Sequence, residues 1–297
     1  MSPETDPVPG DLRQLVDRVE QRLHAAALAH GHGAAHARDE AAWLVLEALG
    51  RSPVEAVDPA RPVTPVERAA VGRLLARRIE ERRPLAYLTG RAWFAGLEFE
   101  VDERVLVPRS PLAEPIAERF RPWLPERPLG RILEIGTGSG CIAVACALAF
   151  PEARIDATDI DAGALELASR NVERHGVGGR VELFRADVYR GLPAHRRYDL
   201  IVSNPPYVDA AAMAALPAEY RHEPPTALAA GTDGLDVVER IVDGARARLT
   251  PDGLLVVEVG RGGPALERRY PRTPFTWLEL AADEVDVFVL PAADLPR

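Results

Sequence analysis

"RILEIGTGSGCIAVACALAF", residues 131–150, is the stretch that decides the fold of this chain. Its first six residues form an apolar run typical of a buried strand. Glycines then stand at every second position, at 136, 138 and 140. The apolar segment 139–149 predicts a helix, which Pro151 stops. A strand that turns through glycines into a helix is where an open α/β sheet binds its ligand.

The residues that follow repeat this strand-then-helix pattern. Repeated units of this kind predict an α/β domain, over 111–297, in which helices cover both faces of a mainly parallel, seven-stranded sheet. The last two strands have no helix between them, so one of them should run antiparallel. Besides the first strand, we expect strands at 154–159, 181–186, 198–203, 253–259, 275–280 and 285–290, and a helix over 162–175 that ends before Gly176.

The N-terminal part contains helical patterns only. Apolar positions between 12 and 23 share one helical face, and 39–49 fits a second helix. Thr64 begins a third helix with a capping box to Glu67, and Pro84 ends it. We therefore expect a small helical domain over 11–90.

We expect an N-terminal tail before the first domain and a linking segment between the two domains. Residues 1–10 are polar and rich in proline, so we expect a disordered tail. Residues 91–110 alternate apolar and charged side chains around "VDER" (101–104). This pattern predicts a linking β-hairpin with its turn at these four residues.

The composition excludes several classes of protein. The 297 residues are 47% hydrophobic and 27% charged, as in ordinary globular proteins. There is no apolar run long enough for a transmembrane helix and no signal peptide, so we expect a cytoplasmic protein without a membrane partner. The net charge of −9 argues against specific nucleic-acid binding. Cys141 and Cys146 fit neither a metal site nor a disulfide framework and should be core residues.

The glycine loop does not match the loops that bind dinucleotides or triphosphates. Its spacing is G-x-G-x-G, whereas the NAD fingerprint needs a glycine at position 141 and a P-loop needs G-K-[ST]. Glu134 stands two residues before the first glycine and would repel a pyrophosphate. A carboxylate here would attract a cation such as S-adenosylmethionine, and glycines let the backbone approach it closely.

Two aspartates end neighbouring strands and suggest further cofactor contacts. Asp159 could accept hydrogen bonds from ribose hydroxyls, and Asp187 lies where an adenine would fit. Each could instead be a helix cap or a turn residue. The predicted cofactor set is Glu134, Gly136, Thr137, Gly138, Ser139, Gly140, Asp159, Asp187 and Asn204.

"NPPY", residues 204–207, follows the strand expected at 198–203 and so lies at the same sheet edge. Adjacent prolines lack N–H groups, so Pro205 presents only its carbonyl beside the Asn204 side-chain oxygen. Two acceptors suit a planar NH2 group, whose nitrogen they could orient for methylation without a strong base. The Tyr207 ring could pack against that planar group. The alternative is a Pro-Pro turn capped by asparagine.

Over nearly its whole length, the chain resembles the protein-(glutamine-N5) methyltransferases, a class I methyltransferase family. The resemblance rests on the helical N-terminal region, the hairpin, "EIGTGSG" (134–140) and "NPPY". One bacterial branch of the family modifies release factors and the other the third large-subunit ribosomal protein. "VDERVLVPRSPLAE" (101–114), "GSGCIAVACA" (138–147) and "PAEYRHEPPTALAAGTDGLD" (217–236) resemble the ribosomal-protein branch.

The resemblance implies a class I methyltransferase fold, S-adenosylmethionine at 136–140 and Asp159, and a protein glutamine received at Asn204, Pro205, Pro206 and Tyr207. It also implies an N-terminal domain that recognises the substrate. Glu223 either contacts the substrate or holds its own loop, and Arg109 has the same pair of interpretations. Release-factor methylation, adenine-N6 methylation and an inactive ribosome-docking module remain alternative hypotheses.

Overall fold

The computed structural model describes residues 10–124, 127–281 and 285–296. The tail expected to be disordered, residues 1–10, lies outside them except for Gly10. The chain divides into two compact units. The first unit contains residues 1–90 and, from far along the chain, 217–222; the second unit contains 91–216 and 223–297.

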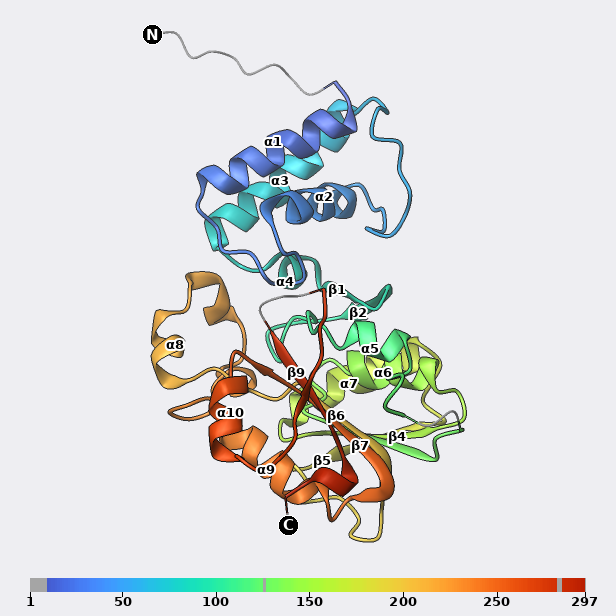
Figure 1. Cartoon of the computed structure of the whole chain (residues 1–297). Helices are drawn as coiled ribbons and strands as arrows, with labels where there is room; N and C mark the ends of the chain where they lie inside the picture. Colours follow the sequence, from blue (N-terminus) through green and yellow to red (C-terminus); the bar gives the residue numbers. More distant parts are fainter. Residues whose placement is uncertain (1–9, 125–126, 282–284, 297) are drawn as a thin grey trace. The chain divides into compact units, whose positions relative to one another are not determined.

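The first unit is helical, as its sequence predicts (Figure 1). The capping box at Thr64 is present: its hydroxyl accepts the Glu67 N–H, and the Glu67 carboxylate accepts the Thr64 N–H. Asp11 caps the first helix by accepting the Gln14 N–H at 2.8 Å. The helices are α1 (Leu12–Ala25), α2 (Ala37–Ala48), α3 (Pro65–Glu81) and α4 (Leu85–Thr89), and the short 3-10 helix η1 (Ala218–His222) joins them.

Polar contacts hold the distant segment 217–222 in this unit. The Glu219 side chain is fully buried and pairs with Arg82 at 2.7 Å. The Tyr220 ring packs against His32, with centroids 4.2 Å apart. A Cβ on Gly31 would lie 2.6 Å from the Tyr220 hydroxyl, so only glycine leaves room for it. The sequence did not predict that a segment beyond the NPPY motif belongs to the helical unit.

The second unit opens with a β-hairpin, whose turn was predicted at the wrong place. Strands β1 (Arg91–Phe94) and β2 (Leu97–Glu100) pair antiparallel around Ala95 and Gly96. Both turn residues have positive φ, 50° and 75°, as a two-residue type I′ turn requires. The usual sequence signal for this turn is Asn-Gly or Asp-Gly, which explains why Ala-Gly was overlooked. "VDER" follows the hairpin instead of forming its turn.

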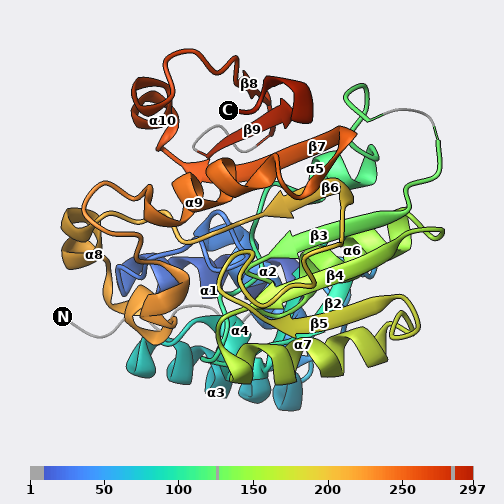
Figure 2. The same cartoon turned by 90° about the horizontal axis from the view of Figure 1, so that it is seen from below.

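The main sheet has seven strands in the order β5-β4-β3-β6-β7-β9-β8, which can be followed in Figure 2. Strands β5, β4, β3, β6 and β7 run parallel to one another. Strand β9 runs antiparallel to both β7 and β8, and an antiparallel strand was predicted among the last two. The strands are β3 (Arg131–Ile135), β4 (Arg154–Asp159), β5 (Val181–Arg185), β6 (Tyr198–Ser203), β7 (Leu249–Gly260), β8 (Thr276–Trp277) and β9 (Asp286–Pro291).

Helices cover both faces of the sheet, and each face has its own apolar core. Successive residues of one strand point to opposite faces, so Ile132 joins the core under α5 and α6 while Leu133 joins the core under α9 and α10. Cys141 and Cys146 are free and buried, as predicted. The helices are α5 (Ala113–Ala117), α6 (Cys141–Ala149), α7 (Ala162–Arg174), α8 (Ala210–Ala215), α9 (Asp236–Ala245) and α10 (Gly263–Arg269), with 3-10 turns η2 (Pro225–Ala227) and η3 (Ala292–Asp294).

None of the helices in the described ranges is both long and apolar enough to span a bilayer.

Candidate functional site

A cavity of about 340 Å³ lies at the carboxyl ends of β3, β4 and β6. The chain order reverses between β3 and its neighbours β4 and β6, and this switch point is where α/β sheets bind ligands. The structure brings most of the predicted residues together there. The cavity is lined by Glu134, Gly136, Thr137, Gly138, Ser139, Asp159, Asp187, Asn204 and Pro206 from the predicted set, whereas Gly140, Pro205 and Tyr207 do not line it.

Backbone hydrogen bonds shape the glycine loop between β3 and α6. The N–H groups of Gly136 and Thr137 both donate to the Thr158 carbonyl at 2.8 Å. Gly140 has a φ of 82°, and a Cβ there would lie 3.2 Å from the Cβ of Ala168 on α7. Gly140 therefore contributes a left-handed turn and close helix packing rather than a cavity wall.

Glu134 presents an incompletely satisfied carboxyl group to the cavity. The side chain is 1% exposed, and the Thr137 hydroxyl donates to its Oε2 at 2.5 Å. Among the described residues, its buried Oε1 has no hydrogen-bond partner. Burial, together with the charge of Asp159, raises the pKa of Glu134 to about 8. A cationic ligand would favour the ionised form of this buried carboxyl group and so lower its pKa again.

The two predicted aspartates both line the same cavity, at the ends of the neighbouring strands β4 and β5. Asp159 accepts the Gly138 N–H at 2.9 Å and the Asp161 N–H at 3.0 Å, so it fixes the glycine loop as well as lining the cavity. Burial raises its pKa despite these hydrogen bonds. Asp187 pairs with Arg240 of α9 at 2.7 Å, and Arg240 also lines the cavity.

The NPPY turn (residues 204–207) places Asn204 on the cavity wall and turns Tyr207 elsewhere. No hydrogen bond engages the Asn204 side chain within the part of the chain that the structure describes. The Tyr207 hydroxyl donates to Glu258 Oε1 at 2.9 Å. Beyond the turn, Val208 exchanges backbone hydrogen bonds with Leu228 and Ala230 at 2.8 and 3.0 Å. The packing of Tyr207 against a substrate amide stays a prediction.

Residues 104–110, here called the strap, form another wall of the cavity. The Glu223 carboxylate holds the strap. It accepts the Val107 N–H at 3.2 Å and an N–H from each of the two terminal nitrogens of Arg109, one of them at 2.8 Å. Glu223 is only 2% exposed. Of the two interpretations left open for each residue, the geometry favours loop holding for Glu223 and a structural ion pair for Arg109.

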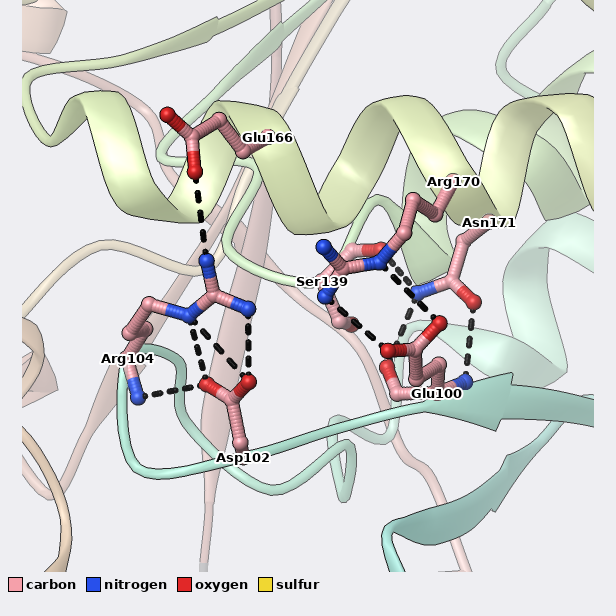
Figure 3. A network of polar contacts seen from close by, with 7 residues as sticks. All are labelled: Glu100, Asp102, Arg104, Ser139, Glu166, Arg170 and Asn171. Carbon is pink, nitrogen blue, oxygen red and sulfur yellow. Dashed lines mark hydrogen bonds and ion pairs between the residues drawn. The ribbon is translucent and has the colours of Figure 1, made fainter.

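Asn171 of α7 joins the strand before the strap to the glycine loop (Figure 3). Its side chain accepts the Glu100 N–H at 2.8 Å and donates to the Glu100 carbonyl at 2.9 Å and the Ser139 carbonyl at 2.8 Å. Figure 3 also shows Arg104 of the strap against Asp102 and Glu166. Asn171 of α7 therefore fixes the glycine loop and the strand that leads into the strap, whereas the ion pair between Arg104 and Glu166 is exposed and adds little.

The sequence did not indicate Asn171, Arg240 and Glu258 as parts of the site, nor any strap residue other than Arg109. Two of these had a usable signal: Asn171 lies on the apolar face of α7, and Glu258 interrupts the apolar run of β7. Polar residues at such positions are buried and need a partner. Arg240 had no distinctive signal, because arginine is common throughout this chain. The strap lies within the motif 101–114 that carried the family resemblance, but no local pattern indicated that it forms a cavity wall.

The fold and the cavity together define a methyltransferase. Residues 118–219 match the family described as Methyltransferase small domain, and residues 14–90 match the PrmC N-terminal domain. Among solved structures, the hMettl16 catalytic domain in complex with MAT2A 3'UTR hairpin 1 has a TM-score of 0.50 at 18% identity, covering 80% of this chain and 85% of that one, which bears on the fold alone.

Curated relatives then identify the family. The chain is 47% identical to the ribosomal protein uL3 glutamine methyltransferase of Bordetella pertussis, over 94% of each chain. It is 44% identical to that of Burkholderia pseudomallei, over 98% of each, and 45% identical to that of Bradyrhizobium diazoefficiens, over 96% and 93%. The chain belongs to the ribosomal protein uL3 glutamine methyltransferase family, and the resemblance predicted from its sequence is confirmed.

Proposed function

We propose that this enzyme transfers the methyl group of S-adenosylmethionine to the side-chain nitrogen, N5, of a glutamine in ribosomal protein uL3. The names of the three curated relatives support the substrate. The observation that carries the chemistry is that Asn204 and the glycine loop line one cavity. An amide acceptor and a cofactor loop in a single enclosed space suit transfer of a group between two bound molecules.

The cavity fits S-adenosylmethionine, which supplies an electrophilic methyl on a sulfonium. The unpartnered Glu134 oxygen would meet the cationic part of the cofactor, and the glycine loop would let its backbone approach closely. Asp159 would accept hydrogen bonds from hydroxyl groups, and Asp187, oriented by Arg240, from an exocyclic amine. The cofactor-contacting residues in this proposal are Glu134, Gly136, Thr137, Gly138, Ser139, Asp159, Asp187 and Asn204, with Gly140 supporting them.

The NPPY turn would receive the glutamine carboxamide. The Asn204 side-chain oxygen, which lines the cavity, would accept one hydrogen of the amide nitrogen. Pro205 does not line the cavity, so its carbonyl would have to turn toward the bound amide to accept the other hydrogen. Holding both hydrogens draws the nitrogen away from planarity, so that its lone pair becomes available to the methyl carbon. After methyl transfer the amide nitrogen would carry an additional proton. It would release this proton readily, because an N-protonated amide is a strong acid. Positioning therefore accounts for most of the catalysis.

The remaining parts of the proposal concern the substrate and its location. All residues that line the cavity belong to the second unit, which leaves the first unit for recognition of the protein substrate. Pro206 lines the cavity beside Asn204 and would border the bound glutamine, whereas Tyr207 does not line the cavity and would support the turn through its contact with Glu258. A ribosomal-protein substrate is consistent with action in the cytoplasm.

The substrate is tested by incubating the purified enzyme with labelled S-adenosylmethionine and, separately, uL3, release factors and ribosomal RNA. Label on one glutamine of uL3, located by mass spectrometry of its peptides, is the expected result. Label on a release factor would move the enzyme to the other branch. Label on adenine would refute protein methylation.

The site is tested by two alanine substitutions with opposite effects. Asn204→Ala should lower kcat by about 10²–10³, as expected when one transition-state hydrogen-bonding group is lost, with little change in cofactor affinity. Asp159→Ala should weaken cofactor binding first, as measured by calorimetry. If both variants change the same parameter, the division of the cavity into an amide part and a cofactor part is wrong.

A further inference from the structure

A buried carboxylate near the end of β7 has no part in the reaction described above. Glu258 is 2% exposed, and its neighbours Val257 and Val259 are buried apolar residues. Burying a carboxylate is costly unless hydrogen bonds compensate it. Its position in an apolar strand therefore calls for specific partners.

Glu258 divides its two oxygens between two hydroxyl groups. Oε1 accepts from the Tyr207 hydroxyl at 2.9 Å, and Oε2 accepts from the Ser110 hydroxyl at 2.5 Å. The Ser110 oxygen also accepts the Leu112 N–H at 3.2 Å, which leaves its own proton available for Glu258. Burial raises the pKa of Glu258, and the hydrogen bonds from Ser110 and Tyr207 together with the nearby charge of Arg109 oppose that rise.

The two hydroxyls come from the segments that border the Asn204 side of the cavity. Ser110 ends the strap and lines the cavity, while Tyr207 is the last residue of the NPPY turn. Glu258 does not line the cavity, so it can influence a bound substrate only through these two residues.

Glycines complete the enclosure of Tyr207. A Cβ on Gly260 would lie 2.6 Å from the Tyr207 ring, and one on Gly234 would lie 2.4 Å from its carbonyl oxygen. The hydroxyl, the ring and the backbone of Tyr207 are thus all held. A turn fixed at its last residue keeps Asn204 and Pro205 in one arrangement, which reduces the reorganisation needed when substrate binds.

We infer that Glu258 is a positioning residue for glutamine methylation, which locks the NPPY turn to the strap through Tyr207 and Ser110. The inference rests on the proposed function. Glu258 acts on the part of the cavity that receives the glutamine amide, at Asn204. Loss of Glu258 therefore lowers kcat toward the protein substrate and leaves cofactor affinity nearly unchanged. A merely structural role would weaken both together.

The test compares Glu258→Gln, Tyr207→Phe and the double variant. Glu258→Gln keeps the shape but replaces one of the two acceptor oxygens with an NH2 group, and Tyr207→Phe removes a single hydroxyl. Each should lower kcat by about ten- to a hundredfold, while the Kd of S-adenosylmethionine changes by less than about threefold. The double variant should be no slower than the slower single variant, because both substitutions break the same contact.

Three outcomes would overturn the inference. These are a kcat of Glu258→Gln within about threefold of the wild type, cofactor affinity that falls in step with kcat, or losses that multiply in the double variant. Wild type is assayed in parallel on uL3 and on release factors. If it methylates a release factor instead of uL3, the proposed substrate fails while the same variants still test Glu258. If it methylates neither, both proposals fail.

Discussion

Replacing Asn171 with alanine should destabilise the second unit by about 2–6 kcal/mol, although this residue touches neither the cavity nor the surface. The side chain is fully buried and makes three hydrogen bonds, to the N–H and the carbonyl of Glu100 and to the carbonyl of Ser139 (Figure 3). Alanine would leave all three backbone groups without this partner.

The magnitude follows from the burial of each orphaned group. The bond to Ser139 is buried, so its loss costs the desolvation of a carbonyl, about 1–3 kcal/mol. The two bonds to Glu100 are part-buried and water can replace them, so each contributes about 0.5–1.5 kcal/mol. Because Ser139 lines the cavity, the same substitution should also weaken S-adenosylmethionine binding.

The neighbouring residue provides a matched control. Arg170 binds the carboxylate of the same Glu100 at 2.9 Å, but both side chains are 44% exposed. Arg170→Ala should therefore cost less than about 1 kcal/mol. Urea unfolding followed by circular dichroism, with calorimetric titration of the cofactor, measures both variants. The reasoning is wrong if Asn171→Ala is as stable as Arg170→Ala.

The other predictions concern the glycine loop and the residue that precedes it. The pKa of Glu134 is raised from 4.5 to about 8, so the free enzyme loses stability as pH rises through this interval. A bound cation favours the ionised form of Glu134, so cofactor binding at neutral pH should release close to one proton. Calorimetric titration in two buffers of different ionisation enthalpy measures this proton release. The Glu134→Gln variant should release no proton on binding. Gly140→Ala should cost about 1–3 kcal/mol, because it adds a left-handed alanine and a contact with Ala168. Compared with Ala168→Gly alone, the double variant lacks only the Cβ contact at 3.2 Å, so the loss caused by Gly140→Ala should shrink but not vanish in thermal unfolding; a loss of zero would refute the backbone contribution.

Local patterns in the sequence predicted most elements of the fold. The strand, glycine loop and helix at 131–149, the Thr64 capping box and the alternation of strands and helices depend on residues a few positions apart. The hairpin turn was misplaced, because Ala95 adopts a positive φ that its residue type does not announce. The strand expected over 275–280 contains only Thr276 and Trp277 as strand residues, since its pairing with β9 ends there.

The sequence by itself determined the family, the parallel sheet and the two motifs that meet at the cavity, because each is written in a short, contiguous stretch. Only the tertiary structure decided that Ser110 and Tyr207 share Glu258, that Glu223 holds the strap and that residues 217–222 belong to the helical unit. These contacts join residues as far as 190 positions apart, as between Tyr220 and His30. Periodicity and turn chemistry constrain only near neighbours, whereas the partner of a buried polar group is chosen by how the completed elements pack.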